Sequence, residues 1–142
     1  MTGAGKAATA GELPLWRLYL LRAMYLVMAA GLGIFMWPSI VSHRPEWPLM
    51  SSVVACMLGA LGLLSVLGLR YPVRMLPLLL FETAWKLIWL IAVALPLWRA
   101  GRFDAATASS VRDCLPVVLV ILVVPWPYVV RTYLLAPGDR WR

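Results

Sequence analysis

The sequence predicts an all-α protein, an integral membrane four-helix bundle with both chain ends in the cytoplasm. Of its 142 residues, 63% are hydrophobic and 13% are charged, whereas a soluble domain of this length needs more polar residues to cover its surface. The apolar residues gather in four runs of about 20 residues or more, the length of α-helix that crosses about 30 Å of hydrocarbon. No run alternates between apolar and polar residues with a period of two, which argues against a β-barrel.

These runs define the domain organisation. With their short connections they make one transmembrane domain over residues 14–136, which follows a small, polar cytoplasmic tail at residues 1–13 and precedes a second tail at residues 137–142. The expected spans cover residues 15–41, 49–69, 75–98 and 115–135.

Two of the runs carry features that predict how they pack or bend. In the second run, small residues recur at helical spacing and predict a close contact with another helix. In the fourth run, Pro125 and Pro127 flank Trp126 and predict a kinked spanning helix. The small residues of the second run are Ser52, Ala55, Gly59 and Gly62.

Basic residues set the expected orientation, because loops rich in Lys and Arg stay in the cytoplasm. With the N-terminus inside, eight basic residues fall on the cytoplasmic side and four on the outer side, and Lys86 lies in the membrane. This bias predicts an N-in, C-in topology, and it falls to six against four if Arg22 and Arg131 are counted as intramembrane. The cytoplasmic set is Lys6, Arg17, Arg22, Arg70, Arg74, Arg131, Arg140 and Arg142, and the outer set is Arg44, Arg99, Arg102 and Arg112.

Several classes of function are not expected. The net charge of +7 is spread singly at the edges of apolar runs, a pattern suited to anionic phospholipid headgroups and not to nucleic acid. The two cysteines, Cys56 and Cys114, are too few for a disulfide framework and are expected to be free thiols. A single histidine, His43, cannot form a metal site, and no catalytic motif is present, so no cofactor, metal or enzymatic activity is expected.

The third run contains the residues most suggestive of function. Glu82 and Lys86 are four residues apart, so on a helix they share one face and can form an ion pair. Arg22 lies at the same expected depth, about 10 Å from the cytoplasmic side, and Arg131 approaches the same leaflet. The sequence therefore predicts an intramembrane cluster of three cations and one carboxylate, with room for an anionic ligand.

Two interpretations of this cluster remain open at this stage. Charges in hydrocarbon need partners. The cluster therefore has either a structural role, in which it fixes helix register, or a functional role, in which it binds an anion or relays a proton. Aromatic residues near it either line a pocket or simply pack against lipid and helices. The candidate pocket-lining residues are Tyr25, Trp85, Trp89 and Tyr128.

The stretch LRYPVRMLPLLLFETAWKLIWLIAVALPLW and the terminal APGDRWR resemble small, uncharacterised bacterial inner-membrane proteins with four helices. The chain is also loosely similar to DoxX-like proteins and to small multidrug transporters. The resemblance implies a multi-pass protein of a bacterial inner membrane, but no activity. In the transporters the essential carboxylate lies in the first helix, whereas here the first helix holds Arg22 and the intramembrane carboxylate, Glu82, is in the third, a departure from the transporters' pattern.

The expected function is therefore non-enzymatic. The chain is expected to act as an accessory or assembly subunit, or to bind an amphipathic anion or lipid through the cluster. Its expected partners are the lipid bilayer with its anionic phospholipid, and either a second copy or another membrane protein. The alternative is a small homo-oligomeric transporter that uses Glu82 as an intramembrane charge.

Overall fold

The computed structural model describes residues 13–42, 46–139 and 141. Nearly all of the expected N-terminal tail, and His43, lie outside the described residues. Over the described part the chain is helical and contains no strand, which confirms the all-α class. Its elements are α1 (Leu15–Val41), α2 (Leu49–Arg70), α3 (Leu76–Trp89), the π-helical turn η1 (Leu90–Ala94), α4 (Leu95–Arg99), α5 (Ala105–Cys114), α6 (Val117–Val123), α7 (Trp126–Val129) and the π-helical segment η2 (Val130–Leu135).

Four helical stretches within the described residues are long and apolar enough to cross a membrane. They cover Leu15–Val41, Leu49–Arg70, Leu76–Arg99 and Ala105–Val123. The third combines α3, η1 and α4, and its π-helical turn carries a hydrogen bond from the Leu95 N–H to the Leu90 carbonyl, directly before Pro96. A wider turn at this point accommodates a proline, which has no N–H to donate and crowds the preceding turn.

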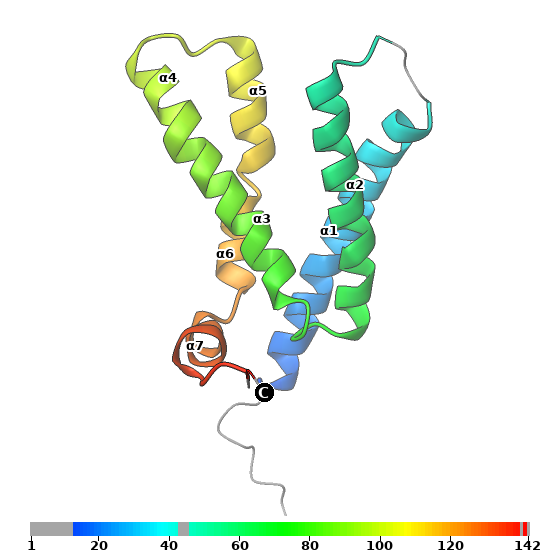
Figure 1. Ribbon diagram of the computed structural model, residues 1–142, viewed down its shortest axis with the longest axis vertical. Helices are drawn as coiled ribbons and strands as arrows, with labels where there is room; N and C mark the ends of the chain where they lie inside the picture. The colour runs from blue at the N-terminus through cyan, green and yellow to red at the C-terminus, as the bar shows by residue number, and fades with distance from the viewer. Residues whose placement is uncertain (1–12, 43–45, 140, 142) are drawn as a thin grey trace, which may run out of the picture.

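The fourth stretch differs from the expected helix at residues 115–135. It begins earlier, at Ala105, and ends at Val123. Val124 is extended, with φ −61° and ψ 126°, because the residue before a proline is driven out of the helical region. Beyond Pro125 the chain changes direction, and α7 and η2 lie across the end of the bundle, where Figure 1 shows α7 almost along its axis. The prolines therefore end the helix instead of kinking it.

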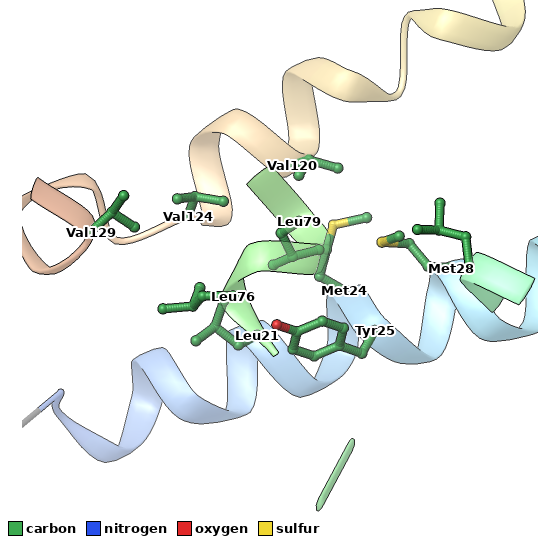
Figure 2. Packing of buried hydrophobic residues seen from close by; sticks show 10 residues of the cluster. Leu21, Met24, Tyr25, Met28, Leu76, Leu79, Val120, Val124 and Val129 are labelled. Atoms are coloured by element: carbon green, nitrogen blue, oxygen red, sulfur yellow. The ribbon is translucent and has the colours of Figure 1, made fainter. Parts of the chain in front are cut away.

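The helices form two arms that meet at one end (Figure 1). The first arm is α1 with α2, and the second is α3 to α6. The start of α1 and the α7–η2 segment lie at the same end of the bundle, where the arms converge. The buried apolar cluster lies there and joins residues of α1, α3, α6 and α7 (Figure 2), among them Tyr25, Leu76, Leu79 and Val120.

The first arm is held by close contact along the small residues of α2, as the sequence predicted. Gly59 and Gly62 are buried against α1 and Ala55 is also buried, whereas Ser52, the fourth residue of the predicted set, is only half-buried. A Cβ atom at Gly62 would lie 2.9 Å from the Cβ of Leu32, so only glycine allows this approach. Ser65, one turn further on, is also buried and donates its hydroxyl hydrogen bond to the Leu61 carbonyl of its own helix.

Two arginines at the start of α1 bind the ends of other helices. The Arg22 Nε lies 3.0 Å from the Leu69 carbonyl at the end of α2, and the Arg17 Nη1 lies 3.4 Å from the Val123 carbonyl at the end of α6. The last carbonyls of a helix have no partner within it, and a cation at that end also interacts favourably with the helix dipole. These contacts help to fix where the two arms converge.

Candidate functional site

Glu82 and Lys86 form a buried ion pair on α3. Their residues are 3% and 8% exposed, and the Lys86 Nζ lies 2.5 Å from the Glu82 Oε1. The second carboxylate oxygen, Oε2, accepts a hydrogen bond of 2.8 Å from the Trp85 indole N–H. Lys86 also lies near the Trp85 ring, 5.5 Å from its centroid. Both oxygens of Glu82 are therefore occupied by neighbours on the same helix.

This pair lines a cleft between the two arms, with a volume of about 510 Å³. From here on, "the cleft" means this space. Its wall on the first arm is apolar, and its wall on the second arm carries the charges. The apolar wall is Met24, Val27, Met28, Gly31, Leu32, Phe35 and Met36 of α1 with Leu58 of α2, and the opposite wall is Glu82, Trp85 and Lys86 of α3, Arg112, Asp113 and Cys114 of α5, and Pro116 and Val120 beyond α5.

The charged residues of α3 and α5 lie at similar heights along the second arm. Lys86 is ten residues from the start of α3, about 15 Å along the helix, measured from the end where the arms converge. Arg112 is eleven residues before the end of α6, which is about 16 Å from the same end. The antiparallel course of α3 and α5 thus brings these side chains to one level of the cleft.

The charges on α5 differ from those on α3 in lacking protein partners. Arg112 and Asp113 are exposed, and neither makes an ion pair or a side-chain hydrogen bond with any residue that the structure describes. Lys86 and Arg112 contribute two positive charges to the lining, and Glu82 and Asp113 contribute two negative ones. The cleft is therefore neutral as a whole, with one satisfied pair and one unsatisfied pair.

The structure does not bring the three expected cations together around Glu82. Arg22 is half-buried on the Leu69 carbonyl, away from the cleft lining. Arg131 is exposed on η2, beyond the break at Pro125. Sequence reasoning failed here because equal depth does not determine which helix faces meet, and because Arg131 was expected on a continuous fourth helix.

Among the aromatic candidates, only Trp85 lines the cleft. Tyr25 is fully buried between α1 and α2, and its hydroxyl donates a 2.9 Å hydrogen bond to the Pro72 carbonyl. Tyr128 on α7 is half-buried and packs against the apolar cluster. Trp89 is half-buried on α3 but does not reach the cleft lining.

Sequence reasoning missed Arg112, Asp113 and Cys114 as site residues because it placed them in or next to a polar loop. The available signal was the cap at the start of α5. Asp104 accepts hydrogen bonds from the hydroxyl and the backbone N–H of Thr107, at 2.6 and 2.7 Å, and these bonds hold the pKa of the Asp104 carboxyl below its usual range. An N-cap of this kind begins a helix, and here the helix continues through the polar segment from Ala105 to Cys114.

Both cysteines are free, as expected. Cys56 is exposed on α2, and Cys114 is buried beside the cleft. No group of three metal-ligating residues lies close together in the part of the chain that the structure describes.

No protein-family model matches this chain, and no match is found among curated proteins or among solved structures.

Proposed function

We propose that this chain is a multi-pass protein of a bacterial inner membrane that binds an amphipathic lipid in the cleft and catalyses no reaction. The observation that carries the proposal is the division of the cleft into an apolar wall on α1 and a charged wall on α3 and α5. A hydrocarbon chain packs well against the first wall, and a polar headgroup requires the second. A volume of about 510 Å³ is within the range of small-molecule sites.

The charge balance of the cleft favours a lipid over a simple amphipathic anion. Three cations around one carboxylate would have suited an anion, but the cleft is lined by two cations and two carboxylates. An anion alone would place a second negative charge beside the Asp113 carboxylate, and like charges at close range repel.

The alternative of a transporter that moves Glu82 as its working charge has less support. Glu82 is held through both of its oxygens, by Lys86 at 2.5 Å and by Trp85 at 2.8 Å. A moving charge would have to break both interactions in each cycle. A pair held in this way suits a fixed wall of the cleft better than a charge that moves during transport.

The proposed orientation is N-in and C-in. The start of α1, which carries Arg17 and Arg22, and η2, which carries Arg131, belong to segments at the end of the bundle where the arms converge, and four helical stretches bring the chain back to that end. A concentration of basic residues marks the cytoplasmic side. Reporters fused after Arg74 and after residue 142 should be cytoplasmic, and a reporter inserted near Ala106 should be periplasmic. A periplasmic signal from the C-terminal fusion would contradict the orientation.

Filling the cleft tests the proposed binding. Gly31 lines the cleft, and a Cβ atom there would meet nothing within 4 Å. The substitution Gly31→Trp should therefore begin its side chain in open space and exclude a lipid, and its melting temperature shows whether the fold is kept. Gly33, on the same helix, is equally open but does not line the cleft, so Gly33→Trp is the matched control.

Phospholipid that remains on the purified protein after detergent washing, measured by mass spectrometry, should fall in Gly31→Trp. It should stay at the parent level in Gly33→Trp. Equal retention in the two variants would place the lipid elsewhere and remove the cleft from consideration.

A further inference from the structure

We propose that the cleft recognises a zwitterionic headgroup in which a phosphate and a primary ammonium are joined by a short linker, with Arg112 binding the phosphate and Asp113 the ammonium. This inference rests on the proposed function and gives the class of lipid that the cleft prefers. It assigns a role to the two residues of α5 whose charges line the cleft and form no ion pair or side-chain hydrogen bond with another described residue.

Only some of the charges that line the cleft are available to a ligand. Glu82 is satisfied by Lys86 and Trp85, and Lys86 is satisfied by Glu82 and the Trp85 ring. A ligand that displaced these contacts would have to replace a buried ion pair. Arg112 and Asp113 present no such obstacle, because neither forms an ion pair or a side-chain hydrogen bond with another described residue.

Arg112 suits the phosphate. A guanidinium is planar and always charged, and it donates paired hydrogen bonds that match the oxygens of a phosphate. The other cation of the cleft lining, Lys86, is neutralised by Glu82, so Arg112 is the donor that remains for the phosphate.

Asp113 suits the ammonium. A carboxylate only accepts hydrogen bonds, and a primary ammonium has three N–H groups to donate. A quaternary ammonium such as choline has the same charge but no N–H, so it would gain only the electrostatic part of the interaction. A headgroup with no cation, such as glycerol phosphate, would leave Asp113 unpaired beside a second negative charge. Asp113 therefore selects against both.

The apolar wall determines how the rest of the ligand lies. Met28 and Phe35 of α1 are seven residues apart, about 10 Å along the helix, and both line the cleft across from α5. An acyl chain can pack along this wall while the headgroup stays at α5. The same headgroup without acyl chains would lose this contact and bind more weakly.

The test compares three phospholipids with identical acyl chains on the delipidated, full-length protein by native mass spectrometry. Phosphatidylethanolamine should bind about tenfold more tightly than phosphatidylcholine or phosphatidylglycerol, the factor expected for a hydrogen bond to a charged group. Asp113→Asn should abolish this preference, and Arg112→Gln should weaken the binding of all three lipids. Arg102→Gln, which removes a cation outside the cleft lining, is the control and should change nothing.

The outcomes separate the two levels of the proposal. If no lipid binds the parent protein, the proposed function fails. If all three lipids bind equally, or if phosphatidylglycerol binds best, only the headgroup assignment is overturned, and the same holds if Asp113→Asn leaves the preference intact. Competition by soluble glycerophosphoethanolamine identifies the source of the headgroup. Failure to compete supports a membrane lipid, whereas effective competition would indicate a free solute, which overturns the proposed lipid and leaves the headgroup assignment in place.

Discussion

Replacing Lys86 with methionine should lower the free energy of unfolding by about 3–5 kcal/mol, the cost typical of breaking a buried ion pair from one side. The variant leaves the Glu82 carboxylate, which is 3% exposed, with only the Trp85 indole as a partner. Thermal unfolding in detergent measures the effect. Arg99→Met removes an exposed cation further along the same stretch and should change stability by less than about 0.5 kcal/mol.

The double variant Glu82→Leu with Lys86→Met separates a structural role from a functional one. It removes both charges, so it should be clearly more stable than Lys86→Met alone. Because the headgroup is assigned to α5, this variant should also retain lipid. A double variant less stable than either single variant would mean that the two residues do not act as a pair. Loss of lipid without loss of stability would show that the pair itself binds the ligand.

Replacing Gly68 with alanine should be the second severe change. A Cβ atom at this position would overlap the Tyr25 ring, which is fully buried and cannot move outward without breaking its hydrogen bond to the Pro72 carbonyl. Overpacking costs about 1–3 kcal/mol, and the lost hydrogen bond adds about 1 kcal/mol. The melting temperature in detergent should therefore fall markedly.

Two variants isolate the cause of this effect. Gly33→Ala adds the same methyl group to α1 where nothing lies within 4 Å, so it should be neutral or slightly stabilising. Tyr25→Phe removes only the hydroxyl and should cost about 1 kcal/mol. If Gly68→Ala were as stable as Gly33→Ala, the close packing of α1 on α2 described above would be wrong.

Much of the helical architecture could be predicted from hydrophobic patterning. The first three apolar runs match their helices closely, and the small residues Ala55, Gly59 and Gly62 lie in the predicted close contact. These features depend on local sequence: a long apolar run needs no partner to form a helix in a membrane, and small residues allow close approach wherever two helices meet.

The fourth helix and the grouping of charges could not be predicted in the same way. Hydropathy placed the start of the helix at Leu115, because the preceding residues are polar, whereas a cap at Asp104 begins it ten residues earlier. The composition of the cleft depends on how α1, α3 and α5 are rotated toward one another. That rotation is set by tertiary packing, so Arg112 joined Lys86 at the cleft while Arg22 bound the end of α2.

The division of roles within the second arm links fold to function. The satisfied pair on α3 gives a fixed, neutral surface, and the unsatisfied charges on α5 remain available to a ligand. In the proposed binding, a headgroup contacts Arg112 and Asp113 without breaking the buried ion pair on α3.

The most direct measurement of lipid binding in the cleft is the amount of phospholipid retained by purified Gly31→Trp compared with Gly33→Trp and the parent. Binding in the cleft predicts a molar ratio of about one lipid per chain for the parent and for Gly33→Trp, and a large loss for Gly31→Trp, with similar melting temperatures for all three. Equal retention by all three proteins would contradict it.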